Sequence, residues 1–285
     1  MMQAASSRKS SQAGGPPPGA SSAFGDAMKL PLYHIDAFAS QVFKGNPAAV
    51  VPLDKWLDDA LLQNIAAENN LSETAFFVRR SDDYDLRWFT PTLEIDLCGH
   101  ATLASAWVLY HERGYKNEAV KFQTRSGPLM VSRRRDLLVL DFPARPPRKV
   151  KAPTGLALAL GAEPVKVLAA RDYLCVFDSE RQVRELKPDF AALARLDRMV
   201  IVTAKSRDVD FVSRFFAPGH GVNEDPVTGS SHCTLVPYWA EQTGKHKLHA
   251  LQVSARGGEL FCELSKDRVL MAGRAVKYLE GSLEV

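Results

Sequence analysis

From residue 28 onward the sequence consists of short apolar runs separated by polar or glycine-containing breaks. The runs at residues 30–38 and 48–53 are rich in branched residues and bounded by Gly, Asn or Pro, which is typical of strands. Two stretches, residues 101–113 and 231–243, carry helical spacing instead. Each ends at a glycine, Gly114 or Gly244, which forms a left-handed helix cap at little cost. The pattern predicts many strands and two main helices.

The two predicted helices belong to an internal duplication with an offset of about 130 positions. Matching positions occur in order along both copies: Phe89-Thr90-Pro91 with Phe216-Ala217-Pro218, Gly99 with Gly229, Gly114 with Gly244, Ser126-Gly127 with Arg256-Gly257, and Arg135-Asp136 with Lys266-Asp267. Two copies are too few for a solenoid. We therefore expect two similar domains, residues 28–143 and 144–285, each a curved sheet around one helix, with the last strand packing back on the first domain. A ligand would lie between them.

Residues 1–27 differ in composition from the rest of the chain. They are rich in Ser, Ala and Gly, contain Pro16-Pro17-Pro18 and have almost no large hydrophobic residues, so they cannot bury enough surface to fold. We expect a disordered tail. A transit peptide is the alternative, because the segment is Ser-rich with Arg8 and Lys9, although the proline run argues against it.

The overall composition excludes several classes of protein. The chain has 285 residues, 46% of them hydrophobic and 24% charged, which is enough apolar material for a packed core. A formal charge of +3 gives no field of the kind that attracts nucleic acid, and no run reaches the ~18 apolar residues that span a bilayer. The four dispersed cysteines contain no CxxC pair and indicate reduced thiols inside a cell. We expect a soluble cytoplasmic protein without nucleic-acid or membrane partners.

A glycine-containing turn precedes each predicted helix. Residues 96–102 read DLCGHAT and residues 225–232 read DPVTGSSH, with Gly99 and Gly229 at matching positions. Free N–H groups at a helix start, with the positive end of the helix dipole behind them, can bind a carboxylate. The alternative is that both glycines only shape turns and that Ser230 and Ser231 only cap a helix. Because the turn recurs in both copies, we favour an anion site.

A single carboxylate, Glu73, stands immediately before the apolar run at residues 74–78. Burial beside this run would raise its pKa towards neutrality and suit it to general acid–base catalysis. From the pattern alone, a partly exposed charge at the end of a strand is the more common explanation.

Four motifs together resemble the phenazine-biosynthesis-like (PhzF-like) family. They are Gly45-Asn46-Pro47-Ala48-Ala49-Val50, Ser72-Glu73-Thr74-Ala75-Phe76, Asp96-Leu97-Cys98-Gly99-His100-Ala101-Thr102 and Glu224-Asp225-Pro226-Val227-Thr228-Gly229-Ser230. Each is weak alone, but four in register over about 250 residues are specific. The resemblance implies a diaminopimelate-epimerase-like α+β fold: two pseudo-symmetric domains, each a curved, mostly antiparallel, barrel-like sheet around a central helix.

The resemblance also implies a function. It makes Glu73 the general acid/base of a cofactor-independent isomerase that moves a proton between carbons of a small carboxylate-bearing substrate. It implies no metal or organic cofactor, and it implies a homodimer. The substrate itself is left open, because fold and motif do not fix it. The residues that would orient the substrate and hold its carboxylate are His100, Asp225, Gly229 and Ser230, together with Gly99 from the first turn.

Cys98 offers a different chemistry, since related racemases of this fold use two facing cysteines. The offset of 130 places Cys98 opposite Thr228, whose hydroxyl cannot ionise near neutral pH, so a two-thiol racemase is disfavoured. A one-thiol racemase using Cys98 stays open, as does a non-catalytic ligand-binding or protein-interaction module. A metal site formed by His100, Asp225 and His232 is disfavoured, because these donors lack zinc-ligand spacing.

Overall fold

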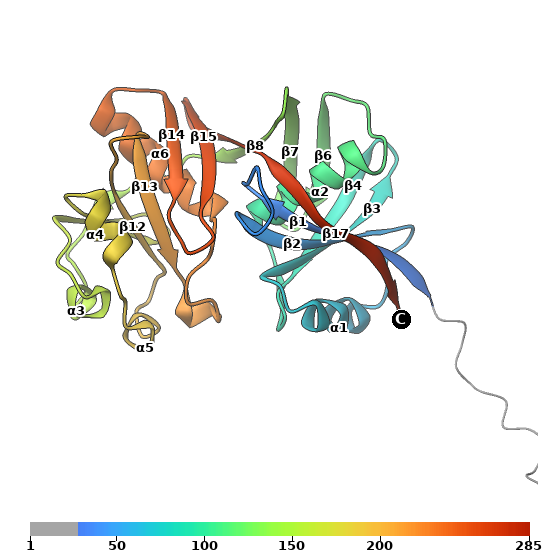
Figure 1. The fold of residues 1–285 in the computed structure, drawn as a ribbon, viewed down its shortest axis with the longest axis horizontal. Helices are drawn as coiled ribbons and strands as arrows, with labels where there is room; N and C mark the ends of the chain where they lie inside the picture. The colour runs from blue at the N-terminus through green and yellow to red at the C-terminus, as the bar shows by residue number, and fades with distance from the viewer. Residues whose placement is uncertain (1–27) are drawn as a thin grey trace, which may run out of the picture.

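A computed structural model describes residues 28–285. Two lobes lie side by side (Figure 1). The first lobe contains β1 (Lys29–Ala37), β2 (Asn46–Leu53), α1 (Asp59–Asn69), β3 (Glu73–Arg80), β4 (Asp83–Phe89), β5 (Glu94–Ile95), α2 (Gly99–His111), β6 (Ala119–Thr124), β7 (Gly127–Arg134), β8 (Leu137–Pro143) and β17 (Ala275–Glu284). The second lobe contains β9 (Arg148–Lys149), α3 (Leu156–Leu160), β10 (Lys166–Ala169), β11 (Tyr173–Val176), α4 (Glu180–Glu185), α5 (Phe190–Leu193), β12 (Val200–Lys205), β13 (Phe211–Phe216), the 3₁₀ turn η1 (Pro218–His220), α6 (Gly229–Thr243), β14 (Lys247–Gln252), β15 (Gly258–Ser265) and β16 (Arg268–Gly273). The predicted tail, residues 1–27, with its transit-peptide alternative, lies outside the described residues.

The strands of both lobes form one hydrogen-bonded sheet whose pairing repeats. The order is β17, β1, β2, β3, β4, β6, β7, β8, β16, β15, β14, β13, β12, β11, β10 and β9, with β5 beside β4. In the first lobe β2–β3 and β4–β6 are parallel pairs connected through α1 and α2. In the second lobe β11–β12 and β13–β14 are parallel, connected through α4–α5 and α6. The remaining pairs are antiparallel, so the predicted α+β class with two pseudo-symmetric halves is confirmed.

The two lobes exchange segments where they join. β8 and β16 pair with each other across the junction. The chain then continues from β8 into β9, which pairs with β10 of the second lobe, and from β16 into β17, which pairs with β1 of the first. Each lobe therefore includes a strand that the chain reaches directly from a strand of the other lobe.

The helices α2 and α6 are the centres of the two lobes. Because α2 packs against β1, β2, β3, β7, β8 and β17, it is buried nearly all round, while α6 packs against β14, β15 and β16. Both helices begin two residues earlier than predicted, at Gly99 and Gly229, and α2 ends two residues earlier, at His111. Four further helices were not predicted. α1 buries one face only, and α3, α4 and α5 are too short to show a period.

A proline inside α6 links this helix to the crossover between lobes. Pro237 has no N–H, so it leaves the carbonyl of Cys233 without its helical partner. That carbonyl accepts the backbone N–H of Arg145, which follows β8, at 2.8 Å. Among residues 28–285, no helix is both long and apolar enough to cross a membrane.

Candidate functional site

The first turns of α2 and α6 meet where the two lobes face each other. A Cβ atom placed on Gly99 would lie 3.5 Å from the Cα of Gly229, and one on Gly229 would lie 3.6 Å from the Cα of Gly99. The N-cap residues, Cys98 and Thr228, make no side-chain capping hydrogen bond. Both positive helix ends, with first-turn N–H groups that the caps do not satisfy, therefore converge on one place.

Glu73 reaches this place from the first residue of β3. The parallel register sets it beside Ala48 of β2, two residues after Asn46. Its Oε2 lies 3.1 Å from Nε2 of His100, and the two side chains are 15% and 5% exposed. The pair is not aligned for a hydrogen bond, and neither atom has a hydrogen-bond partner among residues 28–285. Two buried, adjacent and unsatisfied polar atoms indicate a place where a ligand binds.

His100 has a neighbour on each of its nitrogens. Its Nδ1 lies 3.4 Å from Sγ of Cys98, and its Nε2 lies 3.1 Å from Oε2 of Glu73. Burial by itself lowers the pKa of His100, but its contacts with Cys98 and Glu73 outweigh burial and raise that pKa well above its usual value. Burial raises the pKa of Cys98 to about 11, which favours the neutral thiol at neutral pH.

Asn46 connects this cluster to the second lobe. It is fully buried, and its Nδ2 lies 3.2 Å from Nδ1 of His100, 2.7 Å from Oδ1 of Asp225 and 2.9 Å from the carbonyl oxygen of Val227. Asn46 stands in the motif at residues 45–50 but was not predicted as a site residue. The available signal was an amide between a glycine and a proline at the start of a predicted strand.

Asp225 is the second carboxyl group of the site. The hydroxyl of Thr228 donates to its Oδ2 at 2.5 Å, and Nε2 of Gln252 donates to its backbone carbonyl at 2.8 Å. Burial is the largest cause that raises the pKa of Asp225, to about 6, with Glu73 acting in the same direction and His100, Thr228 and Asn46 opposing. Gln252, which also accepts the N–H of Thr228, was not predicted, because no local motif marks it.

The other predicted residues occupy different places. Ser230 lies in the first turn of α6, where its hydroxyl accepts a hydrogen bond from Arg171 at 2.9 Å. His232 is buried deeper in the second lobe, with Nδ1 2.8 Å from the carbonyl oxygen of Thr228, and burial lowers its pKa to about 4. His232 therefore does not join Glu73 and His100.

One group of possible metal ligands lies in this cluster. Ligand atoms of Glu73, Cys98 and His100 lie within 4.8 Å of one another. The group offers three donors, and the Cys98 thiol, whose pKa burial raises to about 11, would have to lose its proton to coordinate an ion.

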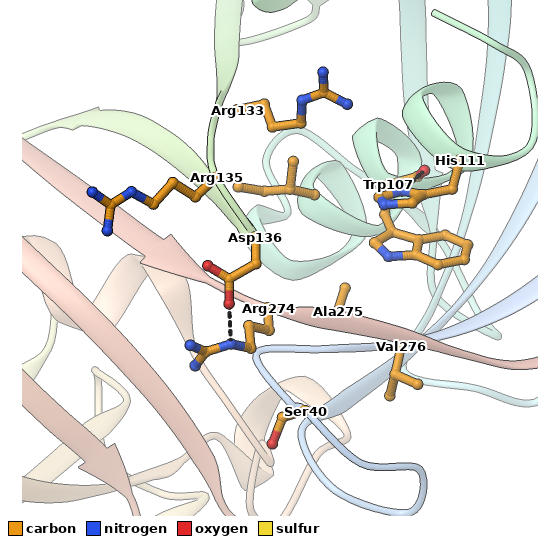
Figure 2. Close-up of a pocket in the computed structure, with 10 residues that line it drawn as sticks. Ser40, Trp107, His111, Arg133, Arg135, Asp136, Arg274, Ala275 and Val276 are labelled. Carbon is orange, nitrogen blue, oxygen red and sulfur yellow. Dashed lines mark hydrogen bonds and ion pairs between the residues drawn. The ribbon is translucent and has the colours of Figure 1, made fainter.

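Two surface cavities lie elsewhere. One, of about 340 Å³, is formed by the end of α2, the β7–β8 hairpin and the start of β17. Figure 2 shows its arginines, Arg133, Arg135 and Arg274, pointing in different directions, with Arg274 paired to Asp136 at 2.7 Å. The other, of about 380 Å³, lies between the β14–β16 strands and the β7–β8 region. Neither cavity is lined by Glu73 or His100.

Comparison with known proteins identifies relatives along almost the whole described chain. The family model described as phenazine biosynthesis-like protein matches residues 35–281. An uncharacterized isomerase of Pseudomonas aeruginosa is 54% identical over 259 residues, covering 90% of this chain and 100% of that protein. Mouse phenazine biosynthesis-like domain-containing protein 2 is 43% identical over 289 residues, covering 90% and 99%.

Solved structures also match the chain over about nine tenths of its length. A PhzF-family protein of Enterococcus faecalis superimposes with a TM-score of 0.89 at 48% identity, covering 90% of this chain and 100% of that one. A hydroxyproline epimerase of Agrobacterium vitis superimposes with a TM-score of 0.60 at 11% identity, covering 90% and 93%, which shows a shared fold alone.

Proposed function

Since the chain belongs to the phenazine biosynthesis-like (PhzF-like) family and is an isomerase, we propose that Glu73 is its general acid/base. In this proposal Glu73 takes a proton from one carbon of a small carboxylate-bearing substrate and returns it to another, without a cofactor. The observation that carries the proposal is the contact between Glu73 Oε2 and His100 Nε2, 3.1 Å apart, buried, and without a hydrogen-bond partner in the described chain.

His100 is the direct neighbour of Glu73 in the site. Its contacts with Cys98 and Glu73 raise the pKa of His100 well above its usual value, against burial, so its ring favours holding a proton that it can donate to the substrate. When substrate enters, Glu73 Oε2 and His100 Nε2 can each form a new hydrogen bond, because they are not aligned with each other. Glu73 can turn to the carbon, and Nε2–H can donate to a polar atom of the substrate.

The two helix starts support the binding of the substrate carboxylate. Removing a proton from a carbon conjugated with a carboxylate shifts the electron pair into that group and increases its negative charge. The N–H groups and dipoles at Gly99 and Gly229 are fixed before reaction, so they stabilise the added charge without reorganising. The electron pair then takes the proton from Glu73 at a second carbon. Atoms and charge balance, and nothing is oxidised.

Asp225 is proposed to fix the orientation of the substrate. Above its pKa of about 6 it is a carboxylate in the second lobe that can accept a hydrogen bond from a hydroxyl or ammonium group. This favours substrates that carry such a group near the carboxylate. Ser230 can add a contact through the first turn of α6.

The alternatives receive less support. A one-thiol racemase needs an ionisable Cys98, but burial raises the pKa of Cys98 to about 11. A non-catalytic module would not need Glu73 Oε2 and His100 Nε2 buried side by side without an aligned hydrogen bond.

Deuterium exchange tests the proposal directly. Cyclic and amino-acid-like carboxylates are incubated with the protein in D₂O, and incorporation is read by mass spectrometry. Glu73→Gln should lower the exchange rate of any accepted substrate roughly 10²–10⁴-fold, the usual contribution of a general base. Glu68→Gln, an exposed glutamate on α1, is the control and should keep the rate. Exchange retained in Glu73→Gln would exclude this role. The homodimer stays a prediction from the resemblance, and the cytoplasmic location stays a prediction from the composition and the dispersed cysteines.

A further inference from the structure

The loop at residues 38–45 positions Asn46 in the site. It connects β1 to β2, and Asn46 is the first residue of β2. Through Asn46 the first lobe holds Asp225 and the carbonyl of Val227 in the second. The position of this loop therefore determines how the two carboxyl-bearing halves of the site face each other.

The backbone of this loop is in an unusual conformation. Phe38 and Phe43 have φ angles of 60° and 69°, values that side-chain-bearing residues rarely adopt, and Gly45 has φ 67°. A Cβ atom on Gly45 would lie 2.1 Å from the carbonyl oxygen of Ala37, so only glycine fits there. Such a backbone persists only when surrounding contacts hold it in place.

Arg256 of the second lobe supplies these contacts. It lies in the β14–β15 turn, and its Nε donates to the carbonyl oxygen of Gly45 at 2.8 Å. Its Nη2 donates to the carbonyl oxygen of Lys44 at 3.0 Å and to Oδ1 of Asp36 at 2.7 Å. The Asp36 side chain is only 2% exposed, and its other oxygen accepts the N–H of Phe43 at 2.8 Å.

A backbone bond completes the attachment. The N–H of Gly45 donates to the carbonyl oxygen of Gly257, the residue after Arg256, at 2.7 Å. The equivalent turn in the first lobe differs, since Ser126 donates to the carbonyl oxygen of Asp96 within its own lobe. The guanidinium bridge between lobes is thus specific to the second copy.

We propose that Arg256 is a positioning residue of the isomerase site: it binds the two carbonyls before Asn46 and the buried Asp36, and so holds Asn46 against His100 and Asp225. The effect of Arg256 on catalysis rests on the function proposed above. The effect of Arg256 on the position of Asn46 does not.

Arg256→Lys separates charge from geometry. Lysine keeps the positive charge beside Asp36, but a single ammonium group cannot reproduce the fork that binds two carbonyls and a carboxylate. We expect Asn46 to shift and its hydrogen bond to Asp225 to weaken. Burial and Glu73 raise the pKa of Asp225, while His100, Thr228 and the hydrogen bond from Asn46 lower it. Because Arg256→Lys weakens the hydrogen bond from Asn46, the pKa of Asp225 should rise in this variant.

The first measurement needs no substrate. The pKa of Asp225 is followed by carboxyl ¹³C NMR in the wild type, Arg256→Lys, Asn46→Ala and the double variant. We expect a rise in each single variant and no further rise in the double variant, because Arg256 acts through Asn46. Arg87→Lys is the control: Arg87 pairs with Glu94 at 2.7 Å and 2.8 Å and does not touch the loop. Arg256→Gln is measured as well, and thermal unfolding checks that each variant is folded.

The second measurement uses deuterium exchange. Arg256→Lys should lower kcat about 10- to 100-fold with KM changed less than about threefold, the effect of a misplaced site rather than of lost binding. An unchanged pKa of Asp225 in both Arg256 variants, or an equal rise in the Asn46→Ala background, overturns the positioning role. If the wild type itself shows no exchange, the proposed function fails, while the NMR result still decides the role of Arg256.

Discussion

Replacing Asp225 with asparagine is expected to stabilise the protein at neutral pH. The carboxyl lies between two lobes, partly exposed, and burial raises its pKa from 3.8 to about 6. A raised carboxyl pKa means that the folded state disfavours the charged form. Its contribution to stability is fully present below pH 3.8, where the group is protonated in both states, and is lost as the pH rises through about 6.

The size of the effect follows from the difference between the two pKa values. A pKa moved from 3.8 to about 6 corresponds to at most about 3 kcal/mol at neutral pH. Asparagine is neutral at every pH, so it does not lose this contribution. The new amide can be accommodated: its oxygen can accept from Asn46 Nδ2, and its NH₂ group can donate to the hydroxyl of Thr228. For a chain of this size, the melting temperature should rise by up to roughly 5–10 °C.

The assay is thermal and denaturant unfolding of both proteins between pH 3.5 and 8. The stability difference between Asp225→Asn and the wild type should be near zero below pH 4, grow through about pH 6 and then level off. Asp54→Asn, an exposed aspartate after β2, should show no such difference. Equal stability at pH 7, or a difference that persists unchanged to pH 3.5, would refute the reasoning.

Two further substitutions test the loop and the thiol. Gly45→Ala should destabilise the fold by at least about 2 kcal/mol in urea unfolding. Alanine at this position would be held in the left-handed region, and its Cβ would clash with the carbonyl oxygen of Ala37. The control is Gly114→Ala, which should cost only about 1 kcal/mol because Gly114 has φ 66° but nothing near its Cβ. Cys98→Ser should keep deuterium exchange within roughly tenfold of the wild type, since an acid/base residue contributes 10²–10⁴-fold. A larger loss would instead support the one-thiol racemase.

Much of the architecture could be predicted because short sequence patterns indicate it. Gly99 and Gly229 mark the starts of two helices, and the offset of 130 between them gives the duplication. The helix α1 was not predicted, because it buries one narrow face only. The last strand was expected to pack back on the first domain, but its register with β1, which pairs Lys29 with Glu284 across 255 positions, has no local signal.

The site was predicted less completely, for a physical reason. Glu73 and His100 stand within recognisable motifs, and the fold brings them to 3.1 Å. Gln252 and Arg256 act on residues contributed by other segments of the chain, through hydrogen bonds that exist only once distant segments pack. A glutamine or arginine in a polar stretch gives no sign of this, because the same residues are common on solvated surfaces.

The duplication itself bears on the kind of isomerisation. A racemase that inverts one carbon needs two comparable acid/base groups on opposite sides of the substrate. Here the two halves present unequal groups: Glu73 beside His100, and Asp225 held by the hydroxyl of Thr228 with a pKa of about 6. Since Thr228 cannot take the place of a second thiol and burial raises the pKa of Cys98 to about 11, inversion by two thiols lacks its bases. A proton that leaves and returns through Glu73 stays on one face of the substrate. We therefore expect migration of the proton between carbons, with deuterium from solvent at the new position, rather than inversion at one.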